Sequence, residues 1–280
     1  MKKLTEWLVT APSLLWLLVF FAIPTGLILV LSFRPADLHG GVGDGWTLDA
    51  VRAVADAAYV PIWWRTFWVS VLSTAGCLLL ALPMSYHLAR LPRRWQGLML
   101  LLVVLPFLTN FLIRIFAWKT LLHPDGVITR GLMALGWMSP DQQLLYNAGA
   151  VVVVMIYVQL PFAILPLYAA AEKFDFALLD AARDLGAGAW NAFWKIFVPG
   201  VWGGLSAAAV MVLISSLGQY VIPQVVGGVS DEMIGNKIAQ RVFSDRNLPA
   251  ASALSALMLL LVMVPLLIAA ARRWRGEGGA

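Results

Sequence analysis

Two small groups of polar residues stand inside otherwise apolar stretches of the chain. Asn110 and Arg114 are four residues apart, so they share one face of a helix. Gln219 and Tyr220 follow two serines and precede Pro223. A charged or amide side chain among apolar residues is costly in lipid unless it faces protein or water. These side chains therefore either bond to neighbouring helices or line a path for a polar solute.

Both interpretations have a physical basis. Polar side chains commonly bond across helices, and Arg114 could bond to an acid or to backbone carbonyls. The clustering around Gln219, followed by a proline and two glycines, favours a helix broken around a cavity. We expect these residues to line a translocation path: Asn110, Arg114, Gln219 and Tyr220.

The composition identifies the environment of the chain. Of its 280 residues, 61% are hydrophobic and 12% are charged, and the mean hydropathy is +0.81. Soluble domains are about 45–50% apolar and about 25% charged. This difference excludes an ordinary soluble protein and predicts a polytopic membrane protein, whose helices face lipid.

Six apolar stretches are long enough to cross a hydrocarbon core, which takes about 20 residues. They cover residues 8–33, 64–88, 98–121, 148–171, 201–226 and 250–271. Lysine and arginine are concentrated at the two ends of the chain and in 90–94 and 173–195, which predicts that both termini are cytoplasmic. We therefore expect an all-α bundle of six transmembrane helices, forming one domain over 1–280. A short interfacial helix is expected within 46–60.

The residues needed for enzymatic chemistry are missing from the sequence. None of the six stretches contains Asp or Glu, the histidines are scattered, and there is one cysteine. No metal-binding or nucleophile motif and no phosphate-cradling loop is present. We expect no catalytic residue, metal site, cofactor or ATP site, and no nucleic-acid partner. Uphill transport would therefore need energy from a partner, and a proton-driven carrier is disfavoured.

A charged, glycine-interrupted segment joins the fourth and fifth stretches. Its sequence, DAARDLGAGAWNAFWKIFVPG over 180–200, predicts a helix over 176–185, an interruption at Gly186 and Gly188, and a second helix over 190–198 that Pro199 ends. We call residues 172–200 the elbow. Such an amphipathic connection either lies against its own bundle or docks into a groove of a partner.

The elbow resembles the EAA motif of inner-membrane permeases of binding-protein-dependent ABC importers. The motif is matched by Ala181, Ala182, Gly186, Ile196 and Pro199. Asp180 stands where the family usually has Glu, which keeps the charge. In that family the elbow is the coupling helix, seated in a cleft of the ATPase subunit. The resemblance implies that ATPase coupling involves Asp180, Ala181, Ala182, Asp184, Gly186, Ile196 and Pro199.

The resemblance also implies an assembly. A permease of this family works with two ATP-binding cassette subunits, a second permease and an extracytoplasmic solute-binding protein. The ATPase activity is then on a separate subunit, so the chain itself is not expected to be an enzyme. Its expected location is the bacterial inner (cytoplasmic) membrane. The second permease in this branch is commonly a different chain.

Two further stretches, 105–118 and 216–228, resemble the branch that includes spermidine and putrescine importers. That branch usually has an acidic residue where this chain has Gln219, and an amide stabilises a cation less well than a carboxylate does. A polyamine or related amine is the expected solute. Amino-acid derivatives, opines and phosphonates remain alternatives. A channel or secondary carrier acting alone is the alternative from another class, and neither would explain the elbow.

Overall fold

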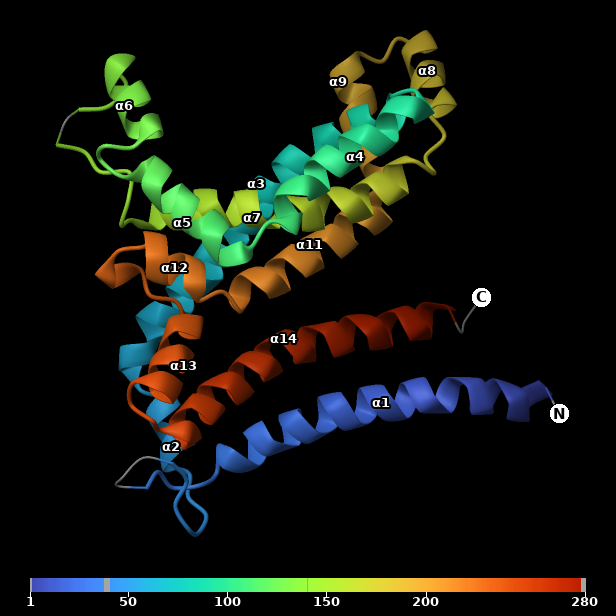
Figure 1. Ribbon diagram of the computed structural model, residues 1–280. Coiled ribbons are helices and arrows are strands. Elements are labelled where there is room, and N and C mark those ends of the chain that lie inside the picture. The colour runs from blue at the N-terminus through green and yellow to red at the C-terminus, as the bar shows by residue number, and fades with distance from the viewer. Residues whose placement is uncertain (1, 38–40, 140, 278–280) are drawn as a thin grey trace. The chain divides into compact units, whose positions relative to one another are not determined.

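The computed structural model describes residues 2–37, 41–139 and 141–277. Within these ranges the regular structure is helical, and the only β pairing is an isolated bridge between Ala36 and Val42. The fold is therefore all-α, as predicted. Contacts divide the chain into two compact units: residues 62–236 form one, and residues 1–61 with 237–280 form the other. Figure 1 shows the elements of each unit.

Four helices are each long and apolar enough to cross a membrane: α1 (Lys2–Leu31), α3 (Val60–Arg90), α7 (Ala148–Ala171) and α14 (Leu248–Glu277). Two further apolar runs are bent. The first joins α4 (Arg93–Leu108) to α5 (Phe111–Leu122). The second joins the helical run Ala189–Gly200 to α11 (Trp202–Leu217). Counting each bent run as one crossing gives up to six candidate spans.

The remaining elements are short. They are α2 (Asp49–Val54), the 3₁₀ turn Ala57–Tyr59, α6 (Val127–Ala134), α8 (Ala177–Asp184), α9 (Ala189–Ala192), the π-helical turn Phe193–Phe197, α10 (Val198–Gly200), α12 (Val221–Val226), the 3₁₀ turn Val229–Asp231 and α13 (Ile234–Phe243). The single interfacial helix expected within 46–60 is thus split into α2 and a 3₁₀ turn. Between them, the Asp56 carboxylate accepts a hydrogen bond from the amide of Ala58 at 2.9 Å and starts the turn.

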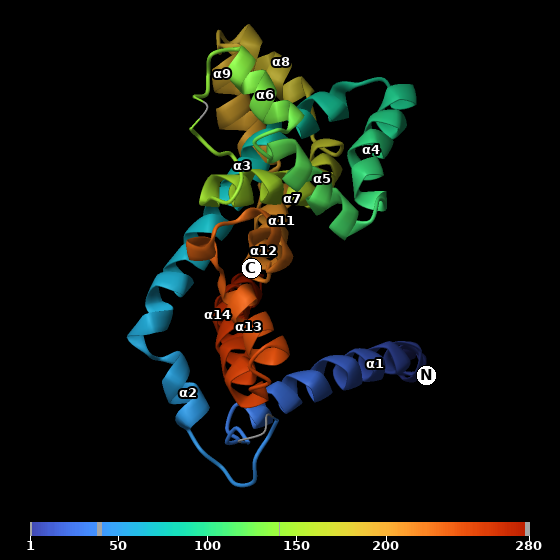
Figure 2. The same ribbon diagram turned by 60° about the vertical axis from the view of Figure 1, so that its left-hand side comes forward.

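The apolar stretch 98–121, which we expected to form one transmembrane helix, is divided between α4 and α5. The chain changes direction by 89° between residues 93–108 and residues 111–134, a bend that can be followed in Figure 2. Pro106 lies in the last turn of α4, Thr109 is extended, and Asn110 caps α5 by accepting hydrogen bonds from the amides of Leu112 and Ile113. A proline followed by a capping asparagine is a helix stop and start signal. The break predicted in the run 201–226 is confirmed, since α11 ends at Leu217 and α12 begins at Val221.

Helix α7 is the centre of the unit formed by residues 62–236, and it contacts α4, α5, α11 and α12. Small side chains let α3 approach it. Three fully buried side chains of α3 donate hydrogen bonds to α7. Ser73 bonds to the Met155 sulfur at 3.8 Å, Cys77 to the Ile156 carbonyl at 3.5 Å, and Ser85 to the Ile164 carbonyl at 3.4 Å. Close approach through small residues is how membrane helices gain packing contacts.

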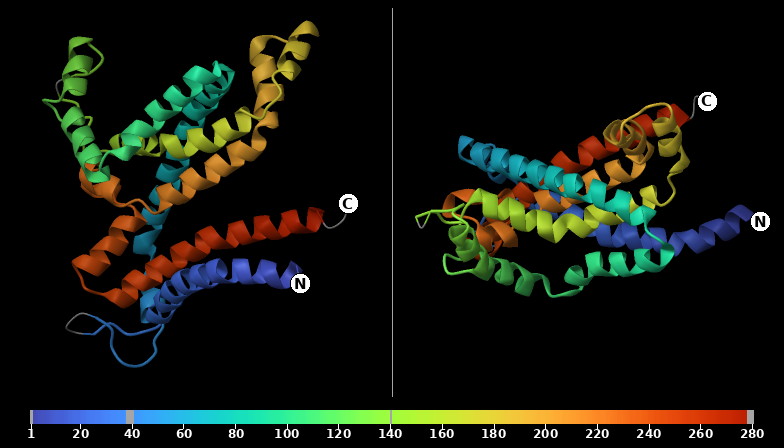
Figure 3. Two further views of the ribbon diagram at one scale, coloured as in Figure 1. Left: turned by 45° about the vertical axis from the view of Figure 1, so that its right-hand side comes forward. Right: turned by 90° about the horizontal axis from the view of Figure 1, so that it is seen from above.

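The other unit contains α1, α2 and α14. Helix α14 packs against both α1 and α2, and Figure 3 shows α1 and α14 side by side. The apolar segment Thr10–Leu31 of α1 has none of its residues buried within the chain. Its side chains are therefore available to lipid or to another subunit.

Packing of α7 on α11 yields a stability prediction. A Cβ added at Gly204 would lie 2.5 Å from the Ala170 Cβ and 2.7 Å from the Pro166 carbonyl oxygen, whereas at Gly203 it would meet nothing within 4 Å. We expect Gly204→Val to destabilise the protein by about 1–3 kcal/mol through overpacking, and Gly203→Val to leave stability nearly unchanged. The check is the thermal unfolding midpoint of each variant in detergent. Equal midpoints for the two variants would contradict this packing.

Candidate functional site

The elbow is a helix–glycine–helix turn with defined geometry. Helix α8 ends in a Schellman motif, in which the Ala187 amide bonds to the Ala182 carbonyl at 3.0 Å and the Gly186 amide to the Arg183 carbonyl at 2.9 Å. Gly186 has φ +89°, a conformation that costs other residues free energy. Gly188, with φ −63°, caps α9. The reversal of the chain at the elbow therefore depends on Gly186.

The elbow has an inner and an outer face. On the inner face, Leu179, Ala182 and Phe197 are buried in a cluster that includes residues of α3 and α7. On the outer face, Leu185 and Trp190 are 90% and 72% exposed. Of the residues predicted to couple to an ATPase, Ala182 is buried and Ile196 is half-buried; exposed are Asp180, Ala181, Asp184, Gly186 and Pro199. The elbow thus rests on its own bundle and still presents apolar side chains outward.

The elbow continues into α11 without a flexible linker. The second elbow helix passes through Pro199 to Gly200, so the prediction that Pro199 ends it is wrong. The break is at Val201, where the direction changes by 74°. Pro199 lies inside this helical run, directly after the π-helical turn Phe193–Phe197, and the run ends one residue later at Gly200. At Gly200, next to the bend, an added Cβ would clash with the Phe174 ring, so this position requires glycine.

Arg114 holds the break between α4 and α5. Its side chain is 8% exposed and its Nη2 donates hydrogen bonds to the carbonyls of Phe107 and Thr109, at 3.1 and 2.9 Å. These carbonyls lie at the end of α4, where no helical partner follows. The Arg114 Nε has no hydrogen-bond partner among the described residues. Bonds to backbone carbonyls are the alternative to lining a path that the sequence leaves open for Arg114, and the structure shows such bonds.

The break between α11 and α12 is held from α13 by Asn236, which sequence analysis missed. Its Nδ2 donates to the Tyr220 carbonyl at 2.9 Å and to the Gln224 Oε1 at 3.0 Å, and its Oδ1 accepts from the Met233 amide at 3.1 Å. The preceding Gly235 approaches the Gln219 carbonyl so closely that a Cβ would lie 2.5 Å from it. A lone asparagine beyond the apolar run gave no periodic signal by which to find it.

The two breaks are neighbours, because α5 begins directly after one, α12 begins directly after the other, and α5 packs against α12. Of the four residues predicted to line a path, Asn110 and Tyr220 are exposed, Gln219 is half-buried and Arg114 is buried. Asn110 and Arg114 do not act as one pair, since Asn110 caps the helix and Arg114 reaches back to α4. The structure brings all four residues to the same region of α5 and α12.

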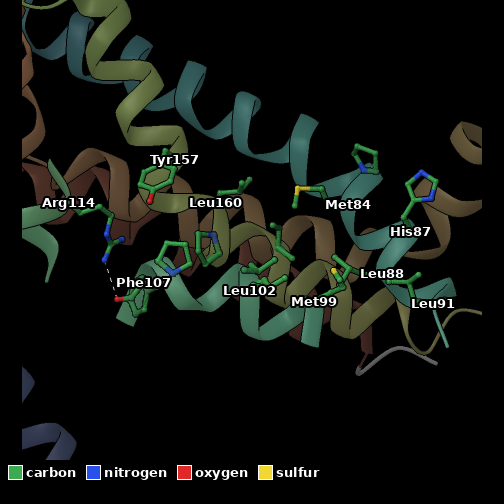
Figure 4. A pocket seen from close by; sticks show the side chains of 15 residues that line it. Met84, His87, Leu88, Leu91, Met99, Leu102, Phe107, Arg114, Tyr157 and Leu160 are labelled. Atoms are coloured by element: carbon green, nitrogen blue, oxygen red, sulfur yellow. Dashed lines mark hydrogen bonds between the residues drawn. The ribbon is translucent and has the colours of Figure 1, made fainter. Parts of the chain in front are cut away.

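A groove of about 600 Å³ lies between α3, α4 and α7. Figure 4 shows Arg114 and Phe107 at one end of it and His87 and Leu91 at the other. The side chains between these ends are apolar apart from Tyr157, whose hydroxyl lies near the Arg114 end. A polar solute would therefore find hydrogen-bond partners only at the ends of this groove.

A family model described as "Binding-protein-dependent transport system inner membrane component" matches residues 3–274. The chain belongs to this family. It is similar to the "Spermidine/putrescine transport system permease protein PotB" of Haemophilus influenzae, with 34% identity over 253 residues that cover 89% of this chain and 88% of the relative. PotB of Escherichia coli is 32% identical, with coverage of 90% and 92%. The chain is therefore an ABC-importer permease of the inner membrane.

A solved structure has the same fold. It is described as a bacterial ABC transporter involved in the import of the acidic polysaccharide alginate, and the chain that matches has a TM-score of 0.75 and 17% identity, with coverage of 97% of this chain and 96% of that one. At this identity the likeness concerns the fold alone. It agrees with the helical architecture and the candidate spans described above.

Asn236 generates a prediction about local stability. Asn236→Leu removes the side-chain bond to the Tyr220 carbonyl and leaves the Met233 amide without its acceptor, a loss of about 1–3 kcal/mol. We expect faster amide hydrogen exchange over 218–226 in this variant and a lower thermal midpoint. Asn191→Leu, at an exposed position of α9, is the control and should change neither. Unchanged exchange over 218–226 in Asn236→Leu would show that Asn236 does not hold the break.

Proposed function

We propose that the chain is the permease through which an ATP-driven importer moves a polyamine or related amine by alternating access. The solute class is supported by the two PotB relatives, whose names state spermidine and putrescine transport. In this proposal the chain crosses the membrane six times, has both termini in the cytoplasm and acts as a single permease domain over 1–280. The basic residues at both ends and near the elbow support this orientation.

The single observation that carries the coupling role is the geometry of the elbow. Exposed Leu185 offers an apolar anchor to a partner, while Leu179 and Phe197 attach the elbow to its own bundle. A partner that moved this turn would move α11 with it, because only the bend at Val201 separates them. We assign ATPase contact to the segment from Asp180 to Pro199, and ATP hydrolysis to two separate cassette subunits.

The proposed assembly also includes a second permease and a solute-binding protein. The family description names a binding-protein-dependent system, and one solved relative is described as a complex with a periplasmic protein bound to an alginate pentasaccharide. The exposed apolar surface of α1 and α14 provides area for lipid and for the second permease. The solute would first meet this chain after release from the binding protein.

The path is proposed to run beside the two breaks, with Asn110, Arg114, Gln219 and Tyr220 at its wall. Two observations favour the alternative proposal, a solute other than a polyamine. Gln219 is neutral, and the Arg114 guanidinium would repel a cation that came close. An amino-acid derivative, an opine or a phosphonate carries the negative charge that such a wall would attract.

The coupling role predicts a difference between two neighbouring glycines. Gly186→Val forces a side chain into a left-handed backbone conformation, at a cost of about 1–2 kcal/mol, whereas Gly188→Val does not, and both positions are open. We expect solute uptake in proteoliposomes containing the whole transporter to fall at least about tenfold for Gly186→Val or Gly186→Pro, with normal membrane insertion. Gly188→Val should retain most uptake. Normal uptake by the Gly186 variants would contradict the coupling role.

The solute class is tested at Gln219. Gln219→Glu places a carboxylate at the break, so uptake of putrescine and spermidine should increase if a cation passes there. The measurement is the initial rate of radiolabelled uptake, with Gln240→Glu on the exposed face of α13 as the control. An unchanged rate and an unchanged order of preferred solutes would mean that Gln219 only packs against its neighbours.

A further inference from the structure

A second hollow lies beside the elbow, next to the apolar groove between α3, α4 and α7. The second hollow measures about 620 Å³ and shares Pro83, His87 and Leu91 with the groove. Its other lining comes from the end of α3 and from the elbow, including Arg90, Arg183 and Trp190. The two hollows share this part of their wall; we call them together the channel, and the basic, aromatic end beside the elbow its mouth.

The mouth has an excess of positive charge. The Arg90 guanidinium lies 5.4 Å from the Tyr86 ring centroid and 5.6 Å from the Phe176 ring centroid, and it donates to the Tyr86 hydroxyl. No carboxylate of the described residues forms an ion pair with it. Arg183 reaches Asp180 at 4.0 Å, and both side chains are exposed. A phosphate at the mouth would receive bidentate contacts that arginine is suited to make.

We propose that this channel binds one anionic phospholipid, with its phosphate at Arg90 and Arg183 and an acyl chain in the groove lined by Met84, Leu102 and Val103. The head-to-tail order fits: charge at the mouth, and an apolar space of about 600 Å³ behind it. A basic pocket between helices at a cytoplasmic membrane surface is a recognised site for anionic head groups. The cytoplasmic placement of the mouth rests on the proposed function, whereas the site itself rests on the geometry.

Other occupants fit less of the surface. A polyamine would be repelled by the two guanidinium groups, and a free phosphate would leave the apolar groove empty. An apolar helix of a second permease would fill the groove and leave Arg90 without a counter-charge. The anionic phospholipid is the occupant that matches both parts of the channel. Its head group would join the end of α3 to the elbow and would therefore influence coupling.

The first test measures lipid retention by native mass spectrometry. The full chain is reconstituted in nanodiscs of phosphatidylglycerol or of phosphatidylcholine, with and without inorganic phosphate. We expect phosphatidylglycerol to be retained over phosphatidylcholine, and the retention to fall at least about tenfold in the double variant Arg90→Gln/Arg183→Gln. Arg130→Gln, an exposed arginine of α6, should have no effect. The proposal would be overturned if both lipids were retained equally or if the double variant lost no lipid. It would also be overturned if inorganic phosphate displaced the lipid completely.

The second test distinguishes lipid from protein in the native membrane. A photoreactive phenylalanine analogue replaces Leu102 in the groove or, as the control, Leu79, which is exposed on α3 outside the groove lining. The proposal predicts adducts of anionic phospholipid at position 102, enriched over those at position 79. An adduct with a polypeptide at position 102 would show that a partner subunit covers the groove, and would overturn the proposal even if uptake depends on the elbow.

Discussion

Backbone N–H and C=O groups within lipid have no water to bond, so each interruption of a helix must be satisfied by the protein itself. Two apolar runs of this chain are interrupted, at 109–110 and at 218–220. At the first, Arg114 bonds to the carbonyls that α4 leaves behind, and at the second Asn236 bonds to the Tyr220 carbonyl. Since α5 and α12 pack against each other, the two breaks lie close together.

Helix α11 connects this region with the elbow. It begins at the 74° bend at Val201 and ends at the second break. Near its end, the Nε2 of the fully buried Gln159 of α7 donates a hydrogen bond to the Ser216 hydroxyl at 2.7 Å. The backbone N–H of Gln219 donates to the Ser216 carbonyl at 3.2 Å. Near its start, Gly204 rests against α7. In the proposed coupling role, a displacement of the elbow would move α11, and α11 would carry that movement to the region around the breaks.

Sequence patterns predicted the helical class and the elbow well, because apolar stretches and glycine signals are local. The range 148–171 coincides with α7, and the Gly186 turn has the positive φ expected of a glycine at a helix end. The break at Asn110 also had a local signal in Pro106 and the capping asparagine, which the apolar run around them obscured. Asn236 could not be foreseen, because its bond to the Tyr220 carbonyl depends on how α13 returns to the break.

The central claim is that the elbow joins this permease to an ATPase. The most direct measurement is affinity purification of the C-terminally tagged chain from mild-detergent extracts, with every retained protein identified and its stoichiometry determined by mass spectrometry. The account predicts two cassette ATPase subunits and a second permease with each tagged chain, and loss of the ATPase when Leu185, which is 90% exposed, is replaced by Asp. Isolation of the tagged chain alone, even from gently treated membranes, would contradict it.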